Sequence, residues 1–207
     1  PTHLAFTGSA LIDGLTVTGK NLGSFTAENT VRFKTDVSDA LVTTSYGCFA
    51  AEDGTYKVDQ LTEENAVAAV IDNDDNSTYY GTLVGAAKAV GARETVKLLK
   101  DCTSAYPVKV NNAAYGMTLD LNGHNITNTD TQSAAKALDL GFGGQDEYPT
   151  VSIINSSDTI ATISAVTPVV ATASQGAMAV DIGKNVTLNS TVDQRQMKLE
   201  GSAYVDV

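Results

Sequence analysis

Polar and apolar residues alternate over short distances in this chain, most clearly between residues 117 and 127. Leu119 and Leu121 fall on one side of an extended backbone and Asp120 on the other, which is the period of two that a half-buried strand requires. The Asn-Gly dipeptide that follows readily supplies positive φ and predicts a corner. The segment therefore reads as a strand, a tight turn and a second strand.

Residues 1–58 also have the pattern of short strands separated by turns. Runs at 4–6, 15–19 and 31–33 favour extended structure, and further short strands follow from Tyr46 onward. The Asp53-Gly54 pair between two alternating runs predicts a β-hairpin. We expect a β-rich N-terminal region, either a separate small domain or the end of a preceding unit.

Residues 59–94 are predicted to hold a hairpin and then a helix. The alanine-rich run 66–71 could begin a short helix after its acidic first turn, but the polar run 72–76 and the strand-like 78–80 favour a hairpin. Thr82 can cap a helix over 82–90, which Gly91 can end. The apolar face of that helix consists of Leu83, Ala86, Ala87 and Val90.

Short segments then recur to the C-terminus, after a strand with a charged outer face at 95–101. Tripeptides of the form apolar–Asp–apolar start at positions 119, 138, 180 and 205, so that the second interval is roughly twice the other two. If this longest interval hides a degenerate copy near 160–163, the period is about 21 residues. The copies are Leu119-Asp120-Leu121, Leu138-Asp139-Leu140, Val180-Asp181-Ile182 and Val205-Asp206-Val207.

Short strands at such spacing are typical of a solenoid, in which each coil stacks on its neighbours and apolar positions form inward columns. An antiparallel sandwich also yields many short strands and turns, but the near-identical pentapeptides at 137–141 and 179–183 favour the solenoid. We predict a mainly β protein: a short right-handed parallel β-helix over residues 95–207, with the N-terminal β region and one capping helix. In this arrangement Leu119 should pair through parallel strands with Leu138 or another residue of the adjacent coil.

Residues 79–90, 95–101 and 119–127 together resemble a recurrent segment of large bacterial cell-surface proteins that carry right-handed parallel β-helix domains of the pectate-lyase-like class. Residues 33–39 and the stretch ending at 53–58 resemble the closing segment of a preceding unit in the same proteins. The resemblance covers about two thirds of the chain. It implies an extracellular protein, secreted or attached to the cell wall, acting in adhesion, glycan contact or spacing, and it transfers no catalytic residue.

Composition narrows the choice of partners. Hydrophobic residues make up 43% of the chain but aromatic residues only 6%, with no Trp, which suits thin regular layers. A net charge of −11 argues against nucleic acid and anionic membranes, which require clustered Lys and Arg. No apolar run approaches the roughly 20 residues of a membrane span. We expect a fragment or processed product of a larger chain, in which Cys48 and Cys102 either form one disulfide or act as small buried hydrophobes.

The candidates for catalysis are a few acidic residues. Asp120, Asp139 and Asp181 could stack in one outer column, as a solvated ladder or as a group that attracts a cation. Hydrolysis of a polysaccharide would need two converging carboxylates, and a lyase would need calcium-binding acids with a Lys or Arg base. No Lys or Arg lies at a spacing that completes a lyase site.

Asp72, Asp74 and Asp75 lie in the densest cluster of oxygen ligands, the kind that Ca²⁺ prefers. The cluster lacks the glycine and the final glutamate of an EF-hand loop, so a polar hairpin tip is the simpler interpretation. Calcium is the one cofactor the sequence suggests.

Several tyrosines near predicted turns could stack on sugar rings, namely Tyr79, Tyr80, Tyr106, Tyr115 and Tyr148. The expected function is a non-enzymatic extracellular bacterial surface module, an adhesin-like or spacer element that contacts carbohydrate or a host or surface protein. The alternative is a polysaccharide lyase or hydrolase built on the same scaffold.

Overall fold

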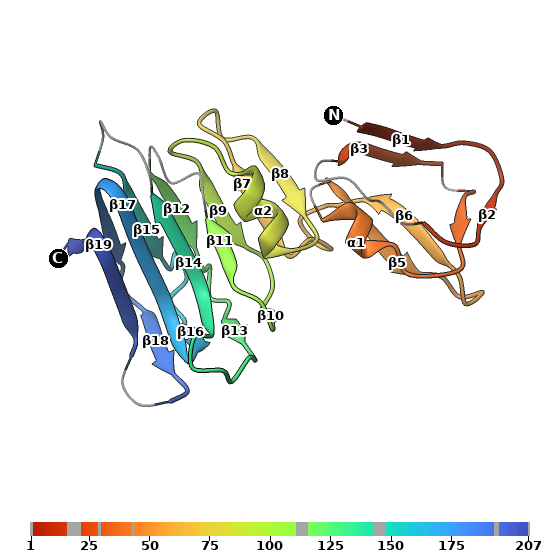
Figure 1. The fold of residues 1–207 in the computed structure, drawn as a ribbon. Helices are drawn as coiled ribbons and strands as arrows, with labels where there is room; N and C mark the ends of the chain where they lie inside the picture. The colour runs from red at the N-terminus through yellow and green to blue at the C-terminus, as the bar shows by residue number, and fades with distance from the viewer. Residues whose placement is uncertain are drawn as a thin grey trace.

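The computed structural model describes residues 2–15, 22–28, 30–42, 44–110, 116–142, 148–192 and 195–206. The protein is mainly β, with 51% strand and 6% helix, and contains a β-solenoid of about three turns, which confirms the expected fold class. Figure 1 shows the solenoid strands stacked side by side, with the N-terminal strands in a separate group beyond helix α2. Within the described residues, no helix is long and apolar enough to span a membrane.

The solenoid has three faces, each made of parallel strands from successive coils. Face A contains β9 (Thr95–Leu98), β12 (Met117–Asp120), β15 (Thr150–Ile154) and the second halves of β17 (Thr167–Ile182) and β19 (Met197–Asp206). Face B contains β10 (Cys102–Ser104), β13 (Ile126–Asn128), β16 (Ala161–Ala165) and β18 (Val186–Ser190). Face C contains β11 (Val108–Val110), β14 (Lys136–Phe142) and the first halves of β17 and β19.

Inward columns of apolar side chains form the core of the solenoid. On face A, Leu119 lies opposite Val96 in the preceding coil and Ile153 in the following one, and the three side chains are 4%, 1% and 0% exposed. The predicted parallel pairing of Leu119 with an adjacent coil is therefore confirmed. Its partner is not Leu138, which lies on face C opposite Val108.

The predicted uniform period is wrong, because successive coils differ in length. Along the face A column the successive partners are Val96, Leu119, Ile153 and Ile182, and the interval from Leu119 to Ile153 is the longest of the three. The tripeptide at 138 belongs to face C and those at 119 and 180 to face A. The motif marks strands in general, because an alternating strand on any face presents the same apolar–polar–apolar form.

A hairpin and a helix close the first end of the solenoid. Strand β7 (Ala68–Ile71) pairs antiparallel with both β8 (Ser77–Tyr80) and β9, so the hairpin extends the edge of face A. Helix α2 (Leu83–Ala89) begins where the Thr82 hydroxyl accepts a hydrogen bond of 3.0 Å from Gly85 N. Its buried face packs into the same core as the columns. The hairpin and the capping helix are both confirmed.

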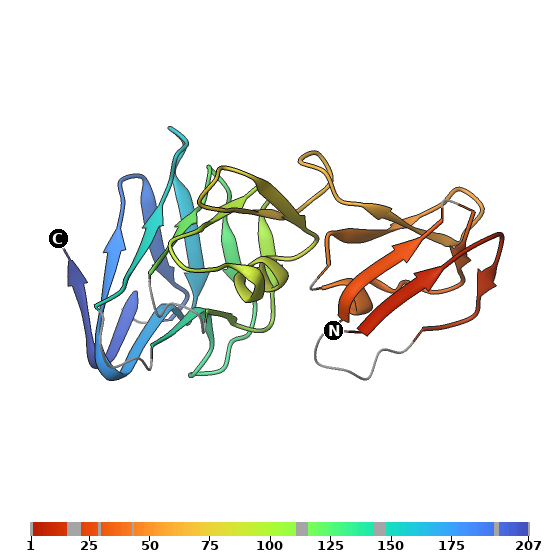
Figure 2. The same cartoon turned by 90° about the horizontal axis from the view of Figure 1, so that it is seen from above.

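The N-terminal residues form a second hydrophobic core. Strands β1 (Thr2–Phe6) and β3 (Leu22–Ala27) are parallel, as are β2 (Leu11–Ile12) and β4 (Arg32–Phe33), whereas β5 (Tyr46–Ala50) and β6 (Tyr56–Gln60) form the predicted hairpin. A short helix, α1 (Ser38–Leu41), packs on them. Figure 2 shows this group next to the capped end of the solenoid. Its fully buried members are Val31, Phe33, Val37, Leu41 and Val58.

The two cysteines contribute to different cores. Both are free thiols of intermediate exposure; Cys48 packs against the N-terminal core and Cys102 against the solenoid core. The alternative of a disulfide between them is therefore not realised. Of the expected N-terminal strands, the run at 15–19 lies mostly outside the described residues.

Candidate functional site

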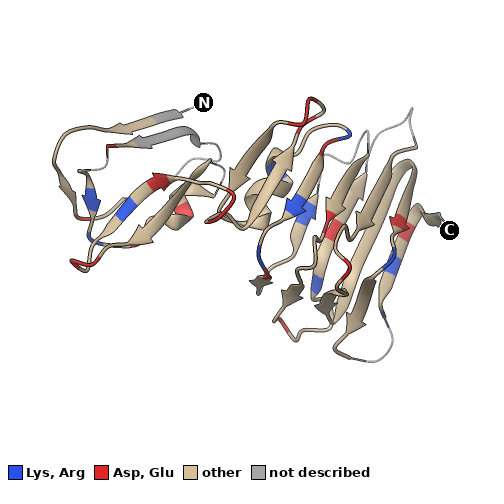
Figure 3. Ribbon diagram, turned by 180° about the vertical axis from the view of Figure 1, so that it is seen from behind, with Lys and Arg blue, Asp and Glu red and all other residues tan. Residues whose placement is uncertain are grey.

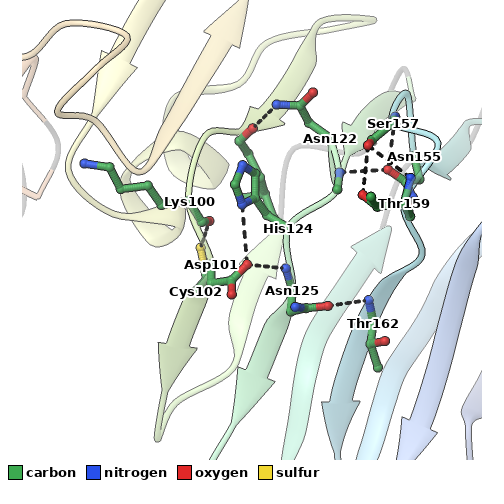
Figure 4. Close-up of polar contacts among 12 residues, drawn as sticks. Lys100, Asp101, Cys102, Asn122, His124, Asn125, Asn155, Ser157, Thr159 and Thr162 are labelled. Carbon is green, nitrogen blue, oxygen red and sulfur yellow. Dashed lines mark hydrogen bonds and ion pairs between the residues drawn. The ribbon is translucent and has the colours of Figure 1, made fainter.

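A network of polar side chains, of which Asp120 and Asn155 are buried, occupies the corner between faces A and B (Figure 4). The predicted corner is present, since Asn122 and Gly123 have φ of 48° and 82°. The side-chain amide of Asn122 donates a hydrogen bond of 2.9 Å to Leu98 O of the preceding coil. Asp120 is 6% exposed, and its Oδ1 accepts from Asn122 N and from Ser156 N, both at 2.9 Å.

Asn155 is the most connected member of this corner. Its Oδ1 accepts from Gly123 N at 2.8 Å and from Ser157 N at 3.2 Å. Its Nδ2 donates to Thr159 O at 2.6 Å and to Asn185 O at 3.0 Å. With only 4% of its surface exposed, Asn155 joins three successive coils through backbone groups that the turns leave without partners in strands.

A second line of contacts runs beside the first. Asp101 Oδ1 accepts from Asn125 N at 2.9 Å and lies 3.4 Å from His124 Nδ1. Asn125 Oδ1 in turn accepts from Thr162 N at 2.8 Å. The hydrogen bond from the backbone N–H of Asn125 is the main reason why the pKa of Asp101 lies below its ordinary value of 3.8. The corner therefore joins successive coils through hydrogen bonds among its own polar groups.

The expected column of aspartates is wrong, because the strand register places its three members apart. Asp120 lies opposite Lys97 and Ile154 on face A. Asp139 lies on face C, where its carboxylate pairs with Lys136 at 2.9 Å. Asp181 returns to face A but lies beyond Ser152, in a different column from Asp120. Figure 3 shows the result, with charged positions scattered singly over the solenoid strands.

In the acidic hairpin tip, the carboxylate of Asp72 accepts hydrogen bonds from residues of its own turn. Asp72 Oδ1 accepts from Asp74 N and Asn76 N, both at 2.9 Å, and both of its carboxylate oxygens accept from Asn76 Nδ2. These bonds, led by that from the Asn76 amide, lower the pKa of Asp72. Asp75 has a φ of 64°, as a tight turn requires. Across the described part of the chain, no group of three or more His, Cys, Asp or Glu is arranged to hold a metal ion.

The tyrosines differ widely in exposure. Tyr80 is 8% exposed and belongs to the solenoid core, and Tyr79 beside it on β8 is half-buried. Tyr106 and Tyr148 are 78% and 76% exposed. Tyr115 lies outside the described residues. Of the tyrosines predicted to contact a ligand, Tyr148 and Tyr106 are therefore the two that the structure presents openly to solvent.

Tyr148 borders a shallow depression of about 580 Å³ on the outer side of face A. Its polar lining comes from exposed Arg93 and from hydroxyl residues at outward positions of β12 and β15, where Thr118 and Ser152 are direct partners. The backbone of Arg93 is fixed beside the depression, because its N–H donates a hydrogen bond of 2.9 Å to Gly116 O. The described residues that line it are Arg93, Gly116, Met117, Thr118, Tyr148, Pro149, Thr150 and Ser152.

Sequence reasoning identified Tyr148 but missed the other polar groups of the depression. The available signal was the set of small hydroxyl residues at alternate positions in two short strands, Thr118 on one and Thr150 and Ser152 on the next. Only the register shows that these strands are neighbours. An exposed ring, a guanidinium and several hydroxyls are the groups that can stack on and hydrogen-bond to a sugar.

A second cavity, of about 440 Å³, lies where β10 meets the start of helix α2 and residues of the N-terminal group. Cys102 and Val84 contribute to its largely apolar wall, and exposed Tyr106 lies at its side. Burial raises the pKa of the Cys102 thiol to about 12, so the thiol is neutral in the folded protein. This cavity also has an exposed tyrosine and the paired strand hydroxyls of Thr103 and Thr127. Unlike the depression on face A, its described lining includes no guanidinium.

No protein-family model, no curated protein and no solved structure matches this chain.

Proposed function

We propose that this chain is a non-enzymatic extracellular module of a bacterial surface protein, of the kind that carries pectate-lyase-like β-helix domains, and that it binds carbohydrate on face A. The observation that carries the proposal is the depression lined by exposed Tyr148, by Arg93 and by hydroxyl residues of two neighbouring strands. The β-solenoid fold supports the proposed family, and the proposed extracellular location follows from the family resemblance.

The chemistry of the depression favours a sugar over other small ligands. A pyranose presents C–H groups on one side and hydroxyls around its rim, so a tyrosine ring can cover the first while hydroxyls and a guanidinium bind the second. Among the residues that the structure describes, Arg93 is the one charged residue in the lining, and a carboxylate-bearing or sulfated sugar would gain a charge-assisted hydrogen bond from it. The shallow shape of the depression suits an internal sugar of a longer chain.

The acidic residues support a binding role over a catalytic one. Asp120 accepts two backbone hydrogen bonds in the corner, Asp139 is paired with Lys136 on another face, and Asp72 is used within its own turn. Glycoside hydrolysis requires two carboxylates on opposite sides of one scissile bond.

Binding of the purified chain to an array of neutral and acidic bacterial, plant and host glycans tests this proposal. Tyr148→Ala and Arg93→Ala should each weaken binding of the selected glycan roughly tenfold, about 1.4 kcal/mol, as measured by titration calorimetry. Tyr106→Ala removes an equally exposed tyrosine outside the depression and should leave binding unchanged. Loss of binding in the Tyr106 variant with retention in the Tyr148 variant would place the site elsewhere. Absence of binding to every glycan would leave the module a spacer.

A further inference from the structure

The corner between faces A and B contains the only Asn-Gly pair in the sequence, Asn122-Gly123. This dipeptide is especially prone to deamidation, because glycine has no Cβ to hinder attack by its own backbone nitrogen on the asparagine side chain. A base removes the proton of Gly123 N, the nitrogen forms a bond to Asn122 Cγ, and the side-chain nitrogen takes up a proton and leaves as ammonia. Water then opens the succinimide ring to aspartate or isoaspartate, and no other reactant is consumed.

The fold requires this labile pair at the corner. Asn122 and Gly123 have φ of 48° and 82°, a region that asparagine and glycine adopt more readily than other residues. A Cβ at residue 123 would lie 2.7 Å from Thr159 Oγ1 and 2.9 Å from Ser157 Oγ. Any residue other than glycine would therefore be strained by its backbone and crowded by the following coil, so the reactive pair is retained for its geometry.

In the folded protein, the groups that would react are already engaged in hydrogen bonds (Figure 4). Gly123 N donates to Asn155 Oδ1 at 2.8 Å, which covers the proton that a base must remove. Asn122 Nδ2 donates to Leu98 O at 2.9 Å, and Asn122 Oδ1 accepts from Ser156 Oγ at 3.4 Å. The side chain is thus held between two other coils. Because Asn122 and Gly123 are only half-buried, these hydrogen bonds protect the pair more than exclusion of water does.

The products of deamidation do not fit the closed corner. Aspartate at position 122 has no side-chain N–H to donate to Leu98 O. It also adds a carboxylate beside Asp120, which is 6% exposed and accepts a hydrogen bond from the backbone N of residue 122; two close carboxylates disfavour each other's charged form. Isoaspartate lengthens the main chain by one carbon and so displaces Gly123 N from Asn155 Oδ1. Either product favours the open corner over the closed one.

We propose that Asn122 is a modification site that the folded corner protects: opening of the corner leads to deamidation, and deamidation prevents the corner from closing again. The solenoid thereby keeps a covalent record of having been unfolded, and prolonged unfolding becomes irreversible. This property is independent of carbohydrate binding, because the corner contacts of Asn122 and Gly123 and the depression on face A share no described residue.

Ageing of the full chain at mildly alkaline pH, folded in buffer and unfolded in guanidinium chloride, provides the first test. Tandem mass spectrometry locates each replacement of an amide by a carboxyl group, and an isoaspartate-specific methyltransferase detects isoaspartate. In the unfolded chain Asn122 should deamidate before any other asparagine, and in the folded chain its rate should be at least about tenfold lower, because reaction then requires local opening. A synthetic peptide of residues 117–127 should react like the unfolded chain. Equal rates at Asn122 in the folded and unfolded chains, or faster reaction at another asparagine of the unfolded chain, would overturn the proposal.

A variant of the protecting residue tests the contact itself. Asn155→Ala removes the acceptor of Gly123 N and should raise the rate at Asn122 in buffer roughly tenfold, as loss of one hydrogen bond allows. Asn189→Ala, at an exposed asparagine of β18, should leave that rate unchanged. An unchanged rate in the Asn155 variant would show that this contact does not protect the pair.

Hydrogen exchange of the Gly123 amide in the unmodified chain gives a test that does not depend on the stability of a variant. In guanidinium chloride concentrations below the unfolding transition, amide exchange at Gly123 and deamidation at Asn122 should rise in parallel, since both require the same opening. Deamidation that stays constant while the Gly123 amide becomes unprotected would contradict the proposed mechanism.

Refolding tests the consequence of the modification. The unfolded chain is aged until part of Asn122 has reacted, the denaturant is diluted, and folded and misfolded molecules are separated by size-exclusion chromatography. The modified residue should be enriched several-fold in the molecules that fail to refold, whereas the folded fraction should contain intact Asn122. An equal share of modified Asn122 in both fractions would refute the irreversible step.

Discussion

Replacing Asn155 with alanine should destabilise the solenoid more than any other single change at an asparagine of the corner. The side chain makes four hydrogen bonds, accepting from Gly123 N and Ser157 N and donating to Thr159 O and Asn185 O. Alanine removes all four at once and leaves the backbone partners in three coils without them. The effect should therefore spread beyond the mutated turn.

The magnitude follows from the number of bonds. A typical intramolecular hydrogen bond contributes about 1 kcal/mol net, so four give about 4 kcal/mol. Thr159 is exposed, and water can replace part of what is lost near it, which sets a lower bound of about 2 kcal/mol. For a protein of this size, 1 kcal/mol corresponds to about 2–4 °C in melting temperature, so the expected decrease is roughly 4–16 °C.

Urea unfolding followed by circular dichroism measures the free energy change, and hydrogen exchange locates it. Protection should fall at the amides of Gly123 and Ser157 while that of the β5–β6 hairpin stays unchanged. Asn189→Ala is the matched control, since Asn189 is exposed on β18 and its side chain makes one long contact, 3.4 Å, with Ser164; it should cost less than about 0.5 kcal/mol. Equal stability of the two variants would refute the view that the corner asparagine joins the coils.

Three other measurements probe a tight turn, a carboxylate and a thiol. Gly116→Ala should cost at least about 1–2 kcal/mol in urea unfolding, since φ is +80° and a Cβ would lie 2.6 Å from a carbonyl oxygen; Gly54→Ala, with similar φ but open space, should cost less. Because the pKa of Asp101 is lowered in the folded state, its stabilisation is present above pH 3.8 and lost as pH falls through the folded value, so Asp101→Asn should flatten the stability profile in this acidic range. Burial raises the pKa of Cys102 from 9.0 to about 12, so iodoacetamide should modify it about a thousandfold more slowly at pH 8 in the folded protein than in urea.

Local patterns predicted much of the fold correctly because each depends on a few neighbouring residues. The Asp53-Gly54 hairpin, the turn at Asn122 and the Thr82 cap each rest on backbone preferences that operate within one turn. The coil length could not be predicted in this way. Loops between the strands vary, so successive coils differ in length, and one motif recurs on two different faces.

The polar residues were harder to interpret, since their role depends on which strand lies beside them. Asp120 has the sequence context of an outward strand position, yet its side chain turns into the corner and accepts backbone hydrogen bonds from two coils. Arg93 lies just before a strand and has no motif around it, but the fold places it in the lining of the same depression as Tyr148. Neither relation is encoded within one segment, because each requires the register between coils that are distant in the sequence.

The alternation along the strands of face A separates the residues that form the core from those that line the proposed binding surface. On β12 and β15, Leu119 and Ile153 point inward and form the column, whereas Thr118 and Ser152 point outward and line the depression. Exposed outward positions away from caps and buried networks usually tolerate substitution within about 0.5 kcal/mol, so face A can change what it contacts while its column and its polar corner stay intact. Stability of this solenoid is therefore to be tested at inward and corner residues, and binding at outward ones, and a variant that alters both at once has disturbed the register.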